Sequence, residues 1–214
     1  MLIDIFHDTV CPWCRIGKKH LFDALAQWQE KAVTIRWHPF LLDNTVPPSG
    51  YEFRSFMRER KGIGVAELQY LFDSTRRAGE AAGVKLDFDK VRLAVNTKLS
   101  HRLINLAPAN RKNDVVEAIY KAYFEDGLNI GDINILTVIG TAYQMEPTEL
   151  RSQLSDDTLV DIVAESQFAR SKGITSVPFF IINNQVQVNG SCSVEVFLQA
   201  LNRAALTEIS AEIW

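Results

Sequence analysis

Two cysteines near the start of the 214-residue sequence carry its clearest chemical signal. Cys11 and Cys14 stand where an apolar run ends and a helical pattern begins, with Pro12 and Trp13 between them. Cysteines at this spacing can close a small disulfide across the first turn of a helix. The unpaired N–H groups and the positive dipole end of that helix favour a thiolate at Cys11. The pattern therefore predicts an exposed nucleophile at Cys11 and a shielded resolving thiol at Cys14.

Half a metal site and a pair of inert buried cysteines are the alternatives to a redox pair. Zinc binds four ligands, usually with a second close pair of cysteines or histidines, but Cys192 stands alone and the four histidines are scattered. We therefore expect no metal. Cys192 lies between two serines at the start of the last expected helix, where a small buried residue is favoured over a second reactive thiol.

Composition indicates a soluble globular protein. Hydrophobic residues make up 47% of the chain, the net charge is −3 and the pI is about 5.8, so neither nucleic acid nor an anionic membrane is an expected partner. Lys18 and Lys19 are expected on a solvated face. The first residues lack the features of a signal peptide, which predicts a cytoplasmic protein. In that reducing compartment, a single close cysteine pair favours catalysis over a structural role.

The thiols must be positioned by a small mixed sheet. The elements expected around them are a strand at residues 2–6, a helix at about 12–28, a strand at 33–38, a helix at about 159–171, a hairpin at 179–188 and a closing helix. The first three form a parallel β-α-β unit.

The long middle of the chain has a different character. Helical patterns follow one another there with almost no strand signal, and the last helix is expected to be capped by Thr148. We therefore predict a domain formed by residues 1–42 and 158–214, with an all-helical subdomain inserted at 43–157. Trp214 ends the chain, and the sequence leaves open whether it packs back on the body.

Pro178 begins the first strand of the expected hairpin, where a missing N–H is tolerated. By base rate alone its peptide bond would be trans. However, a Cys-x-x-Cys pair on the first helix together with Val177-Pro178 before this strand resembles the thioredoxin superfamily. The resemblance implies a cis Pro178 lying against the thiols. It also implies that the backbone of Val177 pairs with an extended substrate segment.

Three motifs narrow the resemblance to DsbA-like proteins with a helical insertion, and among them to the cytosolic FrnE-like branch. They are DTVCPWCRIGK at residues 8–18, NTKLSHR at 96–102 and GITSVPFF at 173–180. The resemblance implies an α/β thioredoxin fold and a thiol-disulfide oxidoreductase or isomerase. Its substrates would be thiol- or disulfide-containing proteins or small thiols, bound beside Pro12, Trp13, Val177 and Pro178. No metal or organic cofactor is implied, and a homodimer is compatible.

Glutathione-using relatives supply the main alternative. The kappa-class glutathione transferases and the 2-hydroxychromene-2-carboxylate isomerases carry serine at the position of Cys11. A thiol there would tend to form a mixed disulfide with glutathione, which favours redox chemistry and leaves glutathione open as reductant or co-substrate. A glutathione-dependent isomerase or transferase acting on small aromatic or polyketide-like compounds remains the second hypothesis. A non-catalytic binding module is the third.

Four further residues are candidates for the cleft around the thiols. The resemblance places Asn96 and His101 on the helical side of the cleft, but a helix cap and a packing residue explain them equally well. His7 could stabilise a thiolate as an imidazolium. Asp8 could move protons for the resolving thiol, although its charge would raise a thiol pKa, and a strand-end turn explains it as well.

Overall fold

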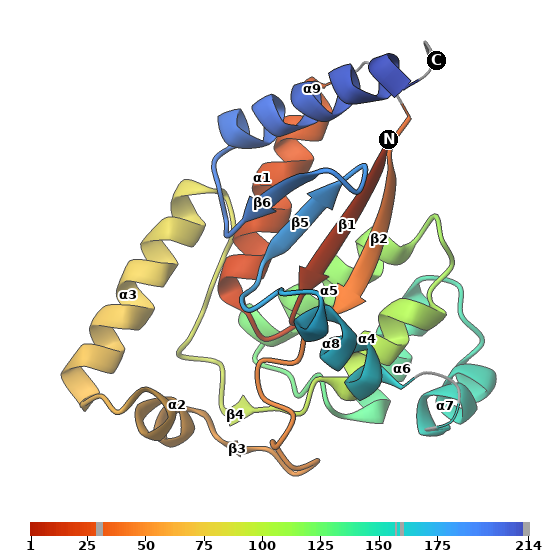
Figure 1. Ribbon diagram of the computed structural model, residues 1–214. Coiled ribbons are helices and arrows are strands. Elements are labelled where there is room, and N and C mark those ends of the chain that lie inside the picture. Colours follow the sequence, from red (N-terminus) through yellow and green to blue (C-terminus); the bar gives the residue numbers. More distant parts are fainter. Residues whose placement is uncertain (29–31, 157, 159–160, 212–214) are drawn as a thin grey trace.

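A four-stranded sheet forms the centre of the computed structural model, which describes residues 1–28, 32–156, 158 and 161–211 (Figure 1). The strand order is β2-β1-β5-β6, with β1 parallel to β2 and antiparallel to β5. The strands and the helix that joins the first two are β1 (Leu2–His7), α1 (Pro12–Gln27), β2 (Thr34–Pro39), β5 (Phe179–Ile182) and β6 (Val186–Asn189). The expected β-α-β unit and C-terminal hairpin are confirmed.

Helices cover both faces of this sheet. Figure 1 shows α1 behind the sheet and α8 (Ile162–Ser171) in front of it, while α9 (Val194–Ala211) runs across one end. Fully buried Phe180 of β5 packs edge-on against Phe197 of α9, with ring centroids 4.8 Å apart. On the opposite face, Phe6 and Phe179 pack against the small apolar cluster that contains Ala169 of α8. Apolar residues reach both faces because alternate strand residues point to opposite sides.

The segment between β2 and α8 is mainly helical. Its elements are β3 (Tyr51–Glu52), α2 (Phe53–Lys61), α3 (Val65–Ala81), β4 (Leu93–Ala94), α4 (Lys98–Leu106), α5 (Lys112–Phe124), α6 (Ile133–Ala142) and α7 (Pro147–Ser155). The expected α/β thioredoxin fold with a helical insertion is confirmed. The insertion also contains the antiparallel β3-β4 pair, which the sequence analysis missed because strands of two residues are too short to show a period.

Several helix ends differ from the sequence analysis. The N-cap of α7 is Glu146 and not Thr148: the Glu146 carboxylate accepts hydrogen bonds from the backbone N–H groups of Thr148 and Glu149. Helix α8 begins at Ile162 after its N-cap Asp161, and the start expected near residue 159 lies outside the described residues. Trp214, whose packing the sequence leaves open, also lies outside them.

A cluster of ion pairs fastens α1 to the insertion. Arg15 Nη2 lies 2.7 Å from Glu117 Oε1 and 2.6 Å from Glu125 Oε1, while Lys18 Nζ lies 2.8 Å from Glu117 Oε2. Lys18 is only 8% exposed, so its expected place on a solvated face is wrong. Its ammonium group lies 4.8 Å from the centroid of the Phe22 ring and meets a carboxylate from α5, a partner distant in the sequence. Lys19 instead pairs with Asp23 at the surface.

No helix in the described part of the chain is both long enough and apolar enough to cross a membrane.

Candidate redox site

The two thiols lie at the N-terminus of α1. Cys11 is the N-cap and Pro12 occupies the first turn, where its missing N–H leaves no bond unmade. The Cys11 N–H donates to Asp8 O at 3.0 Å, and the Cys14 N–H donates to Cys11 O at 3.1 Å. Both sulfur-bearing residues therefore sit on one tight turn that leads into the helix.

Cys11 is more covered than the sequence analysis expected. It is 5% exposed and Cys14 is 2% exposed, whereas Trp13 between them is 40% exposed. The prediction of an exposed Cys11 is wrong, because a loop from the far end of the chain lies over the sulfur. Trp13 does not bury the pair but offers an apolar surface beside it.

That covering loop contains Val177 and Pro178, joined by a cis peptide bond. Cys11 Sγ lies 3.9 Å from Val177 O. Pro178 packs so closely on α1 that a Cβ atom added at Gly17 would lie 3.0 Å from Pro178 Cγ. The absence of a side chain at Gly17 therefore allows the proline loop to rest against the helix that carries the thiols.

The electrostatics of Cys14 differ from those of a free thiol. Burial raises the pKa of Cys14 well above its ordinary value, and the hydrogen bond and charge of Cys11 raise it further. A backbone hydrogen bond from Asp8 lowers the pKa of Cys14, whereas the charge of Asp8 raises it. Cys14 is therefore protonated at neutral pH. A resolving thiol of this kind needs a base before it can attack.

His7 occupies a different place from the one considered in the sequence analysis. It is buried beneath the site, with Nδ1 2.8 Å from the hydroxyl of Tyr120 and its ring 4.7 Å from Trp37. Burial, which disfavours the charged imidazolium, lowers the pKa of His7 well below its ordinary value, and repulsion from neighbouring basic groups such as Lys18 lowers it further. His7 is therefore a neutral imidazole, and this contradicts the hypothesis of an imidazolium that stabilises a thiolate.

Tyr120 is a site residue that the sequence analysis did not single out. Its hydroxyl contacts His7 and lies 3.4 Å from the carbonyl oxygen of Asp8, directly before the thiols. Burial raises the pKa of Tyr120 well above its ordinary value, with further contributions from the charges of Cys14, Cys11 and Asp8. A fully buried tyrosine needs a polar partner for its hydroxyl, and that requirement was the available signal.

Asp8 and His101 meet across the boundary between the sheet and the insertion. Asp8 Oδ2 accepts a hydrogen bond from the Leu42 N–H at 2.7 Å, and Asp8 Oδ1 lies 3.5 Å from His101 Nε2. The hydroxyls of Thr9 and Ser100 form a 2.7 Å hydrogen bond between the same two segments. Helix α4 thus lies directly against the loop that precedes the thiols.

Asn96 lies two residues before α4, whose N-cap position is Thr97, and its side chain already makes two hydrogen bonds. Its Nδ2 donates to Val46 O at 2.6 Å, and its Oδ1 accepts from the Lys98 N–H at 3.0 Å. These contacts favour the role of a cap and loop anchor over that of a cleft residue.

Cys192, the third cysteine, is not part of the thiol pair. Cys192 is half-buried rather than buried as expected, and its Sγ lies 3.4 Å from Asn189 O. In the described part of the chain, no group of three or more His, Cys, Asp or Glu side chains is arranged to hold a metal ion.

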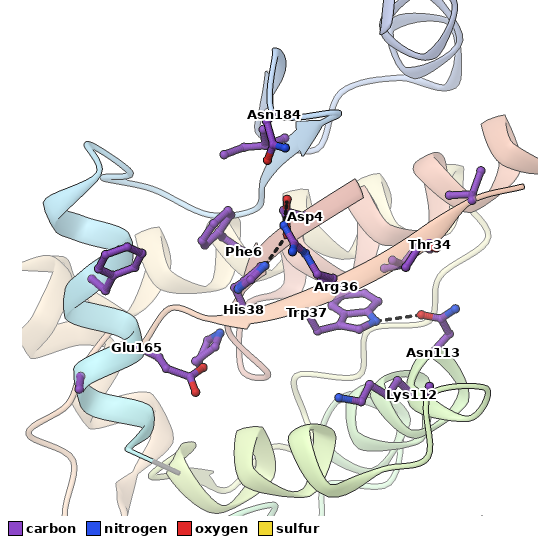
Figure 2. A pocket seen from close by; sticks show the side chains of 17 residues that line it. Asp4, Phe6, Thr34, Arg36, Trp37, His38, Lys112, Asn113, Glu165 and Asn184 are labelled. Carbon is purple, nitrogen blue, oxygen red and sulfur yellow. Dashed lines mark hydrogen bonds and ion pairs between the residues drawn. The ribbon is translucent and has the colours of Figure 1, made fainter. Parts of the chain in front are cut away.

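A cavity of about 1270 Å³ lies elsewhere, over the other face of the sheet (Figure 2). The residues that Figure 2 labels there include Asp4 and Phe6, which alternate along β1 with the buried Ile5. The Asp4 carboxylate accepts from Arg36 at 2.6 and 2.9 Å and lies 2.6 Å from His38 Nε2. None of the described residues that line this cavity is a cysteine, so it is separate from the redox site.

Comparisons with known proteins agree with this geometry. A family model described as "DSBA-like thioredoxin domain" matches residues 2–202. The chain is 26% identical over 204 residues to the uncharacterized protein YwbO of Bacillus subtilis (strain 168), covering 94% of this chain and 95% of YwbO. A probable DsbA oxidoreductase from Streptomyces coelicolor superposes with a TM-score of 0.86 at 26% identity, over 95% of this chain and 89% of that one.

A more distant structure shares the fold. The cytosolic disulfide reductase DsbM from Pseudomonas aeruginosa, solved with GSH, superposes with a TM-score of 0.64 at 14% identity, over 99% of this chain and 100% of that one.

Proposed function

Since this chain belongs to the DSBA-like thioredoxin domain family, we propose that it is a thiol-disulfide oxidoreductase that exchanges disulfides with protein substrates through Cys11 and Cys14. The observation that carries the proposal is the position of Cys11. Cys11 is the N-cap of α1, and its sulfur lies 3.9 Å from Val177 O beside the cis Pro178. The family resemblance expected from the sequence motifs is confirmed.

The reaction proceeds in two exchanges. Cys11 attacks one sulfur of a substrate disulfide as a thiolate, the substrate S–S bond breaks, and a mixed disulfide forms. Cys14 then loses its proton and attacks the Cys11 sulfur. The Cys11–Cys14 bond forms, the second substrate thiol leaves, and two electrons have passed from the dithiol to the substrate. The same steps in reverse oxidise a substrate dithiol.

Each residue near Cys11 contributes to binding or to charge. The first-turn N–H groups of α1 and its dipole stabilise negative charge on the N-cap sulfur. The backbone of Val177 offers hydrogen bonds to an extended substrate segment, a mode that tolerates many sequences. Trp13, which is exposed beside the thiols, supplies apolar contact with the same segment.

We place the reaction in the cytoplasm, with glutathione or another small thiol as the source of electrons. The fold is shared with a protein described as a cytosolic disulfide reductase and solved with GSH, which supports this placement. In a reducing compartment, reduction or isomerisation of protein disulfides is the direction that the thiol pool favours. The two thiols supply both electrons, so the reaction as written involves no metal or organic cofactor.

A glutathione redox titration tests this function. The protein is equilibrated at graded ratios of reduced to oxidised glutathione, its thiols are trapped, and the intact mass is measured. We expect one two-electron transition that joins Cys11 to Cys14. It should be retained in Cys192→Ser and lost in Cys11→Ser.

Failure to form this disulfide at any ratio would overturn the proposal. Stoichiometric binding of glutathione without disulfide formation, together with turnover of a small aromatic compound by Cys14→Ala, would favour a glutathione-dependent isomerase or transferase instead.

A further inference from the structure

Three buried side-chain atoms beneath the thiols lack a hydrogen-bond partner among the described residues. They are Asp8 Oδ1, His101 Nε2 and His7 Nε2. Buried polar atoms are nearly always hydrogen-bonded, because an unmade bond costs stability. A group of such atoms next to a reactive pair therefore calls for a functional explanation.

Asp8 and His101 are held so that two of these atoms face each other. Asp8 Oδ1 and His101 Nε2 are 3.5 Å apart, a distance longer than an ordinary hydrogen bond, and the residues are 1% and 2% exposed. The other carboxylate oxygen of Asp8 is fixed by the Leu42 N–H. The pair therefore has a place for one proton between two fixed atoms.

Cys14 needs such a place. Its thiol is 2% exposed and must lose a proton before it can attack the mixed disulfide, yet bulk water does not reach it freely. Asp8 lies beside this thiol: its backbone hydrogen-bonds to Cys14, and the charge of its carboxylate raises the pKa of Cys14. A basic group inside the protein is therefore the available acceptor.

The other titratable groups around Cys14 are less suited to accept the proton. Tyr120 of α5 has a raised pKa and keeps its own proton, and burial lowers the pKa of His7 of β1 so far below its ordinary value that it is a weak base. Lys18 of α1 is a cation paired with Glu117. Cys11 is itself bound in the mixed disulfide during this step. Asp8 and His101 remain.

We propose that Asp8 and His101 together accept the proton of Cys14 when the mixed disulfide is resolved, a step that rests on the function proposed above. The S–H bond of Cys14 breaks, and the proton completes the missing hydrogen bond between Asp8 Oδ1 and His101 Nε2. The sulfur electron pair forms the Cys14–Cys11 bond. The substrate sulfur leaves with the electrons of the mixed disulfide and takes a proton from water.

The two residues differ in role. Asp8 precedes the thiols on the same loop and acts on Cys14, whereas His101 acts through Asp8 and is a positioning residue. His101 belongs to α4, so the inserted helices contribute a residue to the chemistry.

A two-phase thiol release experiment tests the proposal. In a Cys192→Ser background, the reduced protein is mixed with an aromatic disulfide that releases a coloured thiolate. The first release reports attack by Cys11, and the second reports resolution by Cys14. Both rates are followed against pH in Asp8→Asn and His101→Gln. Ser100→Ala is the matched control, because it removes a hydrogen bond between the same two segments but no titratable group.

We expect the second release to slow at least about tenfold near neutral pH in Asp8→Asn, and by a smaller factor in His101→Gln, because a general base has been lost or displaced. The slowed rate should rise with hydroxide concentration as pH increases. The first release should change less than about threefold. Ser100→Ala should keep the pH profile of the parent.

An unchanged second release in both variants would overturn the proposal. A slowing that is equal at every pH, or equal in Ser100→Ala, would also overturn it by assigning the pair a structural role. If Asp8→Asn does not fold, His101→Gln decides the question alone. Absence of the first release in the parent protein would contradict the proposed function instead, so the two failures are distinguishable.

Discussion

Cys11 Sγ lies 3.9 Å from the carbonyl oxygen of Val177, a residue 166 positions further along the chain. The register of the sheet brings the two together. Phe6 of β1 pairs with Phe179 of β5, so the loop after β1 and the loop before β5 emerge at the same edge. The antiparallel pairing of β1 with β5 is therefore required for the site as well as for the fold.

Replacing the resolving thiol should trap the substrate. In Cys14→Ala, Cys11 can still attack a disulfide but no second sulfur can release it, so a mixed disulfide should accumulate. Intact mass after incubation with insulin or oxidised glutathione measures the adduct. Cys11→Ser should form none and should lose exchange activity. A Cys11→Ser protein that exchanged disulfides at the wild-type rate would contradict the assignment of the nucleophile.

Gly17→Ala should slow disulfide exchange but cost little stability. The new Cβ would lie 3.0 Å from Pro178 Cγ, 3.2 Å from Phe180 Cζ and 3.3 Å from Ser191 Cα. Overpacking costs about 1–3 kcal/mol, but alanine is favoured over glycine in a helix by about 1 kcal/mol, so the net loss should be about 0–2 kcal/mol. Displacement of Pro178 from the thiols should lower the exchange rate about three- to tenfold.

A second helical glycine supplies the control for that measurement. Gly140 lies in α6, and a Cβ there would meet Leu150 Cδ2 and, at 3.1 Å, Met145 Sδ. Gly140→Ala should therefore lose stability without losing exchange activity. Denaturant unfolding and insulin reduction, measured on both variants, separate the two effects. Equal losses of exchange in both would contradict a specific role for the Gly17 and Pro178 contact.

The sequence predicted the parts of the site that depend on local chemistry. The spacing of Cys11 and Cys14 at a strand-to-helix junction is a local pattern, and so is Pro178 at a strand start. The fold class followed from the order of apolar periods and from the family motifs. These features are readable because helix starts, turns and strand starts are specified by neighbouring residues.

The contacts that the sequence did not predict are made between distant segments. Lys18 is buried because Glu117 of α5 meets it. The family resemblance implied that Pro178 lies against the thiols, but it did not predict how fully the Val177 loop covers Cys11. The pairing of Asp8 with His101 depends on where the insertion docks. No periodicity within one segment reports which charged partner or loop another segment will bring.

The ion pairs between α1 and α5 should contribute measurably to stability. Glu117 serves both Arg15, which is buried, and Lys18, although its own side chain is 44% exposed. Breaking a buried pair costs about 3–5 kcal/mol and an exposed pair about 0–1 kcal/mol, so Glu117→Gln should cost about 1–3 kcal/mol. Urea unfolding measures the loss.

An exposed pair near the same helix is the matched control. Lys121 Nζ lies 2.8 Å from Asp126 Oδ2, and both side chains are about half exposed. Asp126→Asn should cost less than about 1 kcal/mol. A loss in Glu117→Gln no larger than this would show that the α1-α5 cluster behaves as ordinary surface charge.

The ionisation of the buried Asp4 should make the free energy of unfolding depend on pH in the acid range. Burial opposes ionisation of Asp4, but hydrogen bonds from His38 and Arg36 outweigh it and lower its pKa from 3.8 to about 2. The folded protein therefore binds this proton less readily than the unfolded chain. The resulting stabilisation, about 2 kcal/mol, is present above a pH of about 4 and is lost as the pH falls towards about 2.

Asp4→Asn removes this stabilisation, since an amide cannot ionise or pair with the Arg36 guanidinium. Urea unfolding should show the variant less stable by about 2 kcal/mol near neutral pH, with the two free energies converging as the pH falls from about 4 to about 2. Asp114→Asn, in an exposed pair with Arg111, is the control and should cost less than about 1 kcal/mol. A free energy of unfolding that differed between Asp4→Asn and the wild type by the same amount at every pH in this range would indicate an effect of packing. The ion pairs of Asp4 would then not account for the acid sensitivity.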